Sequence, residues 1–115
     1  MKTRILVIDA DQTPIEGLRD VLDDNFELVS SDNGSQGENL AREEPPAAVV
    51  LSADVPNGFA HCRRFKKDSS LAKIPLILTS GELEQETLDK HSRLPTRADA
   101  YLKKPFDGET LLALI

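Results

Sequence analysis

The sequence is poor in the residues that mark several large classes of protein. It contains no tryptophan, one cysteine (Cys62) and only 4% aromatic residues. A single cysteine excludes an internal disulfide, and this cysteine content is typical of a protein of the reducing cytoplasm. With so few aromatics, the core must be built mainly from the Leu, Ile, Val and Ala that dominate the 39% of hydrophobic residues.

Long hydrophobic runs and an excess of positive charge are absent as well. No apolar stretch approaches the roughly 18 residues that a membrane-spanning helix needs, and the N-terminus has too few apolar residues to be a signal peptide. The formal net charge is −6, which argues against nucleic acid or an anionic membrane as the main partner. We therefore expect a cytoplasmic protein without membrane insertion and without a nucleic-acid partner.

The length of the chain bounds its organisation. A chain of 115 residues has the size of one domain with one real core. Its last residues, GETLLALI, read as a helix that has been cut short. We expect residues 1–115 to form one domain that is part of a longer protein.

Segments typical of buried strands alternate along the chain with segments typical of helices. The expected strands are apolar runs at residues 4–9, 26–31, 47–52, 74–80 and 100–104. The expected helices, indicated by apolar spacing and by proline positions, cover residues 14–22, 35–44, 59–66, 82–92 and 108–115. This alternation predicts an α/β fold, a doubly wound five-stranded parallel sheet covered by helices on both faces.

The expected topology gathers polar side chains at one edge of the sheet. Right-handed crossovers leave few orders for five parallel strands, and one of the two common solutions is 2-1-3-4-5, with strands numbered along the chain. Its ligand crevice lies beyond the carboxyl ends of strands one and three. The polar residues expected at this edge are Asp9, Asp11, Ser52, Asp54, Ser80 and Lys104.

Four stretches resemble the receiver domains of two-component response regulators: ILVIDAD, PPAAVVLSADVPNG, IPLILTS and ADAYLKKPF. The resemblance covers nearly the whole chain, and it is most specific in ADAYLKKPF, where Tyr101 lies three residues before Lys104. It implies a CheY-like, flavodoxin-like three-layer sandwich that acts in phosphorelay signal transduction. In the family, an aspartate that ends the third strand accepts a phosphoryl group from a histidine kinase, beside a Mg²⁺ ion. A Ser or Thr after the fourth strand and the lysine after the fifth contact the phosphoryl oxygens.

Carried over residue by residue, the resemblance implies a degenerate phosphorylation site. Asp9, Ser80 and Lys104 match the family's first acid, hydroxyl and lysine, whereas Ala10 stands where a second acid should bind Mg²⁺. Counted from the prolines on either side, the acceptor position falls on Ser52. An unactivated serine hydroxyl is a poor nucleophile near pH 7, and both expected side-chain ligands of Mg²⁺ are missing. We expect no phosphorylation by the family route, no cofactor, and a metal-free pair between Asp9 and Lys104.

Asp54 is an alternative phosphoacceptor. A register shift of two residues would let Asp54 end the third strand with the same side-chain facing, and the domain would then be a genuine Mg²⁺-dependent receiver. The competing interpretation is a loop aspartate that accepts hydrogen bonds from nearby backbone N–H groups. A third hypothesis is a small-ligand binder that uses the emptied acidic pocket.

Other polar residues have structural interpretations. Cys62 shares a helical face with Phe59 and is expected in the core, and no other Cys or His lies at metal-ligand spacing from His61 and Cys62. A run of basic residues in the same segment is expected on a solvated helix face, with a docking patch for an acidic partner as the alternative. These residues are Arg63, Arg64, Lys66 and Lys67.

A second resemblance, which is less specific, is to receiver-like domains that lack the phosphorylation site. Such pseudo-receivers lie at the N-terminus of myxobacterial gliding-motility proteins, ahead of long coiled coils, and are similar in GFAHCRRFKKDSSLAKIPLIL and KHSRLPTRADAYLKKPF. The resemblance implies a non-enzymatic scaffold or targeting module that binds protein partners and has a role in motility. The expected partner surface is the face of the fourth helix, fifth strand and fifth helix, including His91 and Tyr101. The alternatives are a part-buried or solvent-exposed His91 without a binding role and a Tyr101 that is a fixed packing aromatic.

Overall fold

A computed structural model describes the chain except residues 1–2, 12, 23–24, 105–107 and 115. The described strands are β1 (Thr3–Ile8), β2 (Phe26–Ser31), β3 (Ala48–Ser52), β4 (Leu76–Ser80) and β5 (Ala100–Lys103). The described helices are α1 (Thr13–Val21), α2 (Gly34–Glu43), α3 (Gly58–Lys67), α4 (Gln85–His91) and α5 (Gly108–Leu114). The strands pair in parallel in the order β2-β1-β3-β4-β5, which confirms the predicted fold class and strand order.

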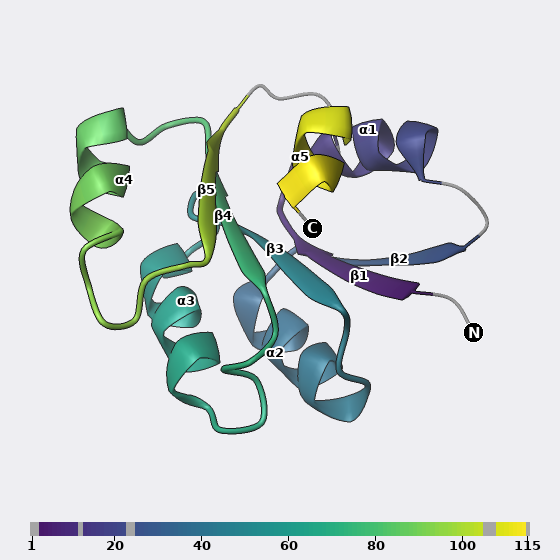
Figure 1. Ribbon diagram of the computed structural model, residues 1–115, viewed down its shortest axis with the longest axis horizontal. Helices are drawn as coiled ribbons and strands as arrows, with labels where there is room; N and C mark the ends of the chain where they lie inside the picture. Colours follow the sequence, from purple (N-terminus) through teal and green to yellow (C-terminus); the bar gives the residue numbers. More distant parts are fainter. Residues whose placement is uncertain (1–2, 12, 23–24, 105–107, 115) are drawn as a thin grey trace.

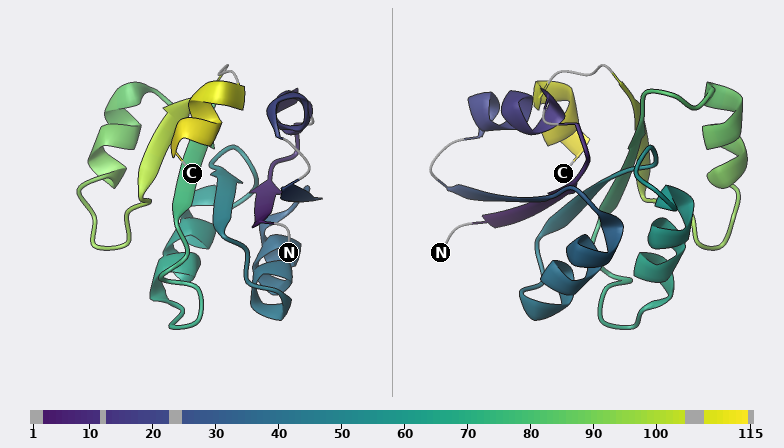
Figure 2. Two further views of the ribbon diagram at one scale, coloured as in Figure 1. Left: turned by 45° about the vertical axis from the view of Figure 1, so that its right-hand side comes forward. Right: turned by 180° about the vertical axis from the view of Figure 1, so that it is seen from behind.

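Helices cover both faces of the sheet. Helices α1 and α5 pack together on one face, α2 and α3 pack together on the other, and α4 lies at the β5 end (Figures 1 and 2). Alternate residues of each central strand face two separate cores, as the period of two requires: in β1, Leu6 and Ile8 face one, and Ile5 and Val7 face the other. Of the described helices, none has the length and apolar character needed to cross a membrane.

Differences from the predicted boundaries occur at the ends of elements and have local causes. Strand β4 begins at Leu76 rather than residue 74 because Pro75 has no N–H to donate to a neighbouring strand. Helix α4, predicted to begin at Glu82, begins at Gln85. The Ser80 hydroxyl oxygen accepts the backbone N–H of Glu82 at 3.3 Å and of Leu83 at 2.9 Å, which holds these residues in a bend before the helix. The other predicted ends lie within two residues of the observed ones, and residue 115 lies outside the described residues.

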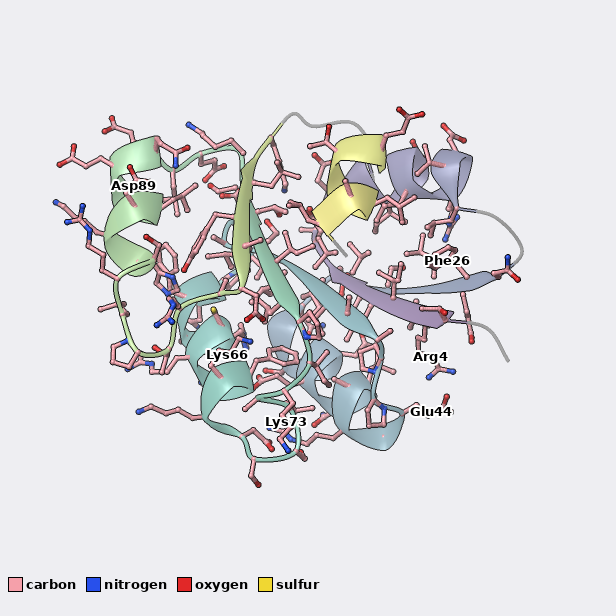
Figure 3. The ribbon with its side chains drawn as sticks, viewed as in Figure 1. Arg4, Phe26, Glu44, Lys66, Lys73 and Asp89 are labelled. Carbon is pink, nitrogen blue, oxygen red and sulfur yellow. The ribbon has the colours of Figure 1, made fainter. Side chains whose placement is uncertain are left out.

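The basic run of α3 is more fully paired than the sequence predicts. Arg64 Nε lies 3.2 Å from the buried carboxylate of Glu38 on α2, which also lies 2.8 Å from His61 Nδ1. The largely buried side chain of Lys66, labelled in Figure 3, pairs with Asp99 at 2.5 Å. The prediction of a solvated basic face was therefore wrong for Lys66, whose side chain is only 11% exposed. Arg64 is exposed as predicted, although it is also paired. The carboxylates of both pairs lie far along the chain, 26 and 33 residues away.

Cys62 is fully buried in the core on the α2 and α3 side of the sheet, as predicted. Burial raises the pKa of its thiol to about 11, because an apolar environment disfavours the charged thiolate. The residue therefore packs as a small hydrophobe rather than as a reactive group.

Candidate functional site

The carboxyl ends of four strands bring the predicted site residues to one edge of the sheet. Asp9 follows β1, Ser52 ends β3, Ser80 ends β4 and Lys104 follows β5. The register of the parallel strands fixes how far along the sheet these residues lie, since Ser52 pairs with Thr79 and Ser80 pairs with Lys103. An open pocket at this edge is lined by Asp9, Ala10, Asp11, Asp54, Val55, Gly81, Glu82 and Lys104.

Lys104 is the centre of the site. Its Nζ lies 2.8 Å from Asp9 Oδ2, and the two side chains are only 13% and 5% exposed. The same ammonium donates to the Ser52 hydroxyl oxygen at 3.2 Å and lies 3.6 Å from Asp54 Oδ2. The other oxygen of Asp9 accepts the backbone N–H of Asp11 at 2.9 Å. The predicted ion pair between Asp9 and Lys104 is present.

Ser52 is a poor candidate for a nucleophile. The residue is 1% exposed, and its hydroxyl oxygen accepts hydrogen bonds from Lys104 Nζ and from the backbone N–H of Asp54 at 3.1 Å. In the part of the chain that the structure describes, no imidazole or carboxylate hydrogen-bonds to this hydroxyl. The arrangement therefore supplies no general base that could activate it.

Asp54 does not end β3. The strand stops at Ser52, which is paired with Thr79, and Asp54 lies in the turn that follows. The register shift by two residues, which would have put Asp54 at the strand end, is therefore not adopted. Its carboxylate still reaches the pocket, because the turn directs it toward the end of β4.

The Asp54 carboxylate binds groups that are distant in sequence. Oδ1 accepts from the Ser80 hydroxyl at 2.9 Å and Oδ2 accepts from the Gly81 backbone N–H at 2.8 Å, 26 and 27 residues further along. Burial acts to raise the pKa of Asp54, but these two hydrogen bonds and the Lys104 charge outweigh it, and the pKa lies below its ordinary value. The predicted bond to a backbone N–H is present at Gly81, although this group is distant in sequence. The bond from the Ser80 hydroxyl was not predicted, and no sequence pattern signals it.

His91 and Tyr101, predicted on a partner surface, are joined to each other. His91 Nδ1 lies 2.6 Å from Tyr101 Oη, which accepts the backbone N–H of Ala98 at 3.0 Å. The Tyr101 hydroxyl can therefore donate its own proton to Nδ1 of a neutral His91. Burial lowers the pKa of His91, which favours this neutral form. His91 is only 7% exposed and its ring stacks on Phe59 at 4.5 Å between centroids, so little of the residue reaches the solvent.

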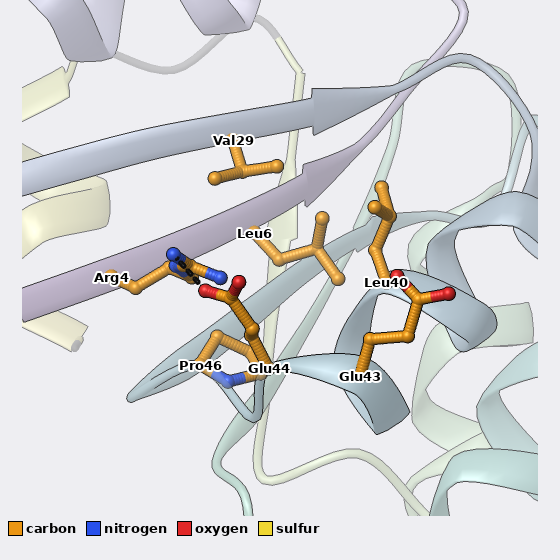
Figure 4. Close-up of a pocket in the computed structure, with 7 residues that line it drawn as sticks. All are labelled: Arg4, Leu6, Val29, Leu40, Glu43, Glu44 and Pro46. Carbon is orange, nitrogen blue, oxygen red and sulfur yellow. Dashed lines mark ion pairs between the residues drawn. The ribbon is translucent and has the colours of Figure 1, made fainter.

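A small pocket at the opposite edge of the sheet contains none of the predicted site residues. It has an apolar floor and a charged rim, formed by Arg4, Leu6, Val29, Leu40, Glu43, Glu44 and Pro46 (Figure 4). Arg4 is ion-paired with Glu44 and with Glu27. The pocket has a volume of about 60 Å³, which holds a few water molecules. Ligand pockets usually measure roughly 300 to 1,000 Å³.

The profile of the response regulator receiver domain matches residues 5–115 of the sequence. The chain belongs to the response regulator receiver family. It is therefore a receiver domain of two-component signalling, and the strand-end cluster of Asp9, Ser80 and Lys104 lies where the resemblance places the family's site.

Curated relatives differ in how much of their length this receiver spans. Protein PilH of Pseudomonas aeruginosa is 36% identical over 115 residues, which cover 97% of this chain and 93% of PilH. The DNA-binding dual master transcriptional regulator RpaA of Synechocystis is 32% identical over 121 residues, which cover 97% of this chain and 47% of RpaA. The receiver thus spans nearly all of one relative and about half of the other.

Solved structures share the fold. The chemotaxis response regulator CheY4 of Vibrio cholerae superposes with a TM-score of 0.80 at 18% identity, covering 100% of both chains. A putative response regulator from Chloroflexus aurantiacus gives a TM-score of 0.81 at 19% identity, covering 98% of this chain and 93% of that one. At these identities the likeness establishes the CheY-like fold.

Four acidic residues, Asp9, Asp11, Asp54 and Glu82, line the strand-end pocket. Across the described residues, no three side chains of His, Cys, Asp or Glu cluster closely enough to hold a metal ion. His61 lies against Glu38, and Cys62 is buried in the core. At the strand ends, the cation beside Asp9 is the ammonium of Lys104.

Replacing Asp54 with alanine should lower the free energy of unfolding at pH 7 by about 1 to 2 kcal/mol, because two hydrogen bonds to a carboxylate are lost. The folded-state pKa of Asp54 is depressed, so this contribution is present above the unfolded-state pKa and is lost as the pH falls through the folded value. Urea unfolding at pH 7 and near pH 3 should show the difference between wild type and Asp54→Ala shrinking in acid.

The control is Asp20→Ala, an exposed aspartate on α1, which should change stability by less than about 0.5 kcal/mol. An Asp54→Ala difference that stays constant between the two pH values would contradict the assigned role of the ionised carboxylate.

Proposed function

We propose that this receiver acts independently of phosphorylation, as a module that binds a protein partner. One observation carries the proposal: the polar groups of the site form their hydrogen bonds and ion pairs with one another. Lys104 pairs with Asp9 and donates to Ser52, and Ser80 donates to Asp54. The two groups that the resemblance assigns to phosphoryl oxygens therefore already have partners within the chain.

The donor set also argues against a Mg²⁺ ion. Magnesium requires near-octahedral oxygen ligands and usually binds one or two protein carboxylates. Ala10 offers no side-chain oxygen, and Asp9 is bound to an ammonium group at 2.8 Å, whose charge would repel a cation. We infer that the receiver works without a metal cofactor and without enzymatic activity.

We place the partner surface on α4, β5 and α5. Tyr101 supports this placement, because its hydroxyl is held between His91 and the Ala98 backbone in one arrangement with no phosphoryl group needed. A partner would meet a surface whose shape is already set. The module would work in the cytoplasm, and the resemblance to domains of gliding-motility proteins is the reason to propose a role in motility.

A genuine phosphoacceptor at Asp54 is the second candidate function. The observation in its favour is that the Asp54 carboxylate lines the open pocket and lies 3.6 Å from Lys104 Nζ. Against it, both carboxylate oxygens are already hydrogen-bonded to the end of β4.

Intact mass measured after incubation with acetyl phosphate and Mg²⁺ separates the two functions. We expect no added phosphoryl group in the wild type, while a receiver with an intact acceptor aspartate, treated in parallel, gains one. A gain in the wild type that is lost in Asp54→Ala would overturn the proposal and establish a phosphorelay receiver with a displaced acceptor. Circular dichroism of the wild type and of Asp54→Ala confirms that both are folded.

A further inference from the structure

A groove between α3 and the segment after α4 is not part of the strand-end site. It encloses about 330 Å³ and is lined by Phe59, Arg63, His91, Leu94, Pro95 and Thr96. The segment from α4 to β5 runs beside α3 in all three ribbon views (Figures 1 and 2). The stacked rings of Phe59 and His91 form its apolar wall.

The groove exposes apolar surface that the fold leaves uncovered. Leu94 is 46% exposed, and in the described part of the chain Leu114 is the other exposed large hydrophobic residue. Its neighbours in the groove are a proline and an aromatic stack. An exposed apolar patch rimmed by polar residues is typical of an interaction site.

The charge at this groove is opposite to that of the protein as a whole. The chain has a net charge of −6, yet Arg63 lines the groove and Arg93 and Arg97 flank Leu94 in sequence, all three exposed. In the described structure none of these three arginines forms an ion pair. Arg4, Arg42 and Arg64, by contrast, are each paired with a carboxylate of the chain itself.

We infer that this groove docks an acidic, amphipathic segment of a partner protein, which inserts an apolar side chain beside Leu94 and places carboxylates against Arg63 and Arg93. Guanidinium groups bind carboxylates bidentately and are enriched at interface hot spots. The volume suits one or two apolar side chains of an amphipathic helix, as in other helix-in-groove complexes. This inference rests on the proposed function, whose partner it assigns to a chemical class.

The contacts of His91 connect the groove to β5. The ring of His91 lines the groove, while its Nδ1 is hydrogen-bonded to Tyr101 Oη behind it. Tyr101 is thus a positioning residue for the groove wall. Through these two residues the groove borders the α4 and β5 surface that is proposed for the partner.

The probe is a synthetic amphipathic peptide of about 15 residues, with leucines on one helical face and glutamates beside them, titrated into the folded receiver. We expect amide shifts concentrated at Phe59, His91, Leu94 and Thr96, and roughly tenfold weaker binding for Arg63→Glu. The matched control is Arg19→Glu on α1, exposed and far from the groove, which should leave binding unchanged. A peptide with lysines in place of the glutamates should not bind.

Several outcomes would overturn the inference. An equal loss of peptide affinity in Arg63→Glu and Arg19→Glu would indicate nonspecific electrostatic attraction. A dimer of the receiver that dissociates in Arg63→Glu would assign the groove to a second copy of the chain. Each titration is repeated with acetyl phosphate and Mg²⁺. Binding that requires acetyl phosphate would refute the proposed phosphorylation independence while keeping the groove. Absence of binding under both conditions would refute the groove and leave the mass test unaffected.

Discussion

Replacing Lys104 with methionine should lower the free energy of unfolding by about 3 kcal/mol or more, because it leaves a buried carboxylate without its cation. Asp9 is 5% exposed and its Oδ2 lies 2.8 Å from Lys104 Nζ. Methionine keeps most of the length of the lysine side chain, so the loss reports the missing charge rather than missing packing. Chemical denaturation at pH 7 measures the effect directly.

A double-mutant cycle assigns the loss to the pair. Asp9→Asn combined with Lys104→Met should recover much of the stability, because neither charge is then buried alone. The matched control is Lys90→Met, which removes an exposed ion pair with Glu86 at 3.6 Å, where both side chains are more than 70% exposed, and should cost less than about 1 kcal/mol. If Lys104→Met lowers the free energy of unfolding no more than Lys90→Met does, the pair of Asp9 and Lys104 does not stabilise the site.

This pair also bears on how the site works. A coupling energy of about 3 kcal/mol between the two side chains corresponds to a more than hundredfold preference for the paired state of Asp9 and Lys104 over the state in which Asp9 is unpaired. A metal ion would have to displace Lys104 against this preference before it could use Asp9 as a ligand. The stability cycle and the mass test therefore examine the same proposal by independent measurements.

Much of the fold follows from local sequence patterns. Apolar runs such as Ile5–Ile8 are buried on both faces of the sheet, and a parallel sheet makes such runs obligatory. The ends of these strands fixed where Asp9, Ser52 and Lys104 would meet, because the carboxyl ends of parallel strands share one edge. The pairing of Asp9 with Lys104 could be predicted for this reason.

The contacts that could not be predicted are made by side chains whose partners lie far along the chain. Asp54 binds Ser80 across 26 residues, and Lys66 binds Asp99 across 33. Which atoms meet depends on the length and path of the intervening loops, and these have no periodicity to read. The start of α4 was misplaced for a related reason, because the Ser80 hydroxyl captures the N–H groups of Glu82 and Leu83 before the helix begins.

The burial of His91 shows the same limit. Helical spacing places His91 near the face of Leu88 but does not reveal the ring that it meets. Phe59, which was expected to share the core face of α3 with Cys62, stacks on His91 across the α3 and α4 interface. This contact explains the burial of His91, for which a part-buried position was one of the interpretations, and makes its ring a wall of the groove.

Gly58→Ala should lower the free energy of unfolding by about 3 kcal/mol, because a Cβ at this position would overlap the backbone. It would lie 2.5 Å from the carbonyl oxygen and 2.6 Å from the Cα of Ala53. The φ angle of Gly58 is not positive, so space rather than backbone conformation requires glycine here. Gly17→Ala, inside α1 with no atom within 4 Å of the added Cβ, should instead stabilise by roughly 0.5 to 1 kcal/mol.

The same variant tests what holds Asp54 in place. Ala53 can give way only by moving the turn between β3 and α3, and Asp54 is the next residue in that turn. Amide hydrogen exchange at Gly81, whose N–H is bound to Asp54 at 2.8 Å, should then quicken in Gly58→Ala as it does in Asp54→Ala. If Gly58→Ala lowers stability but leaves Gly81 protected, Asp54 keeps its position through Ser80 and Lys104 alone. If protection is lost, the short turn closed by Gly58 is what delivers the carboxylate to the end of β4.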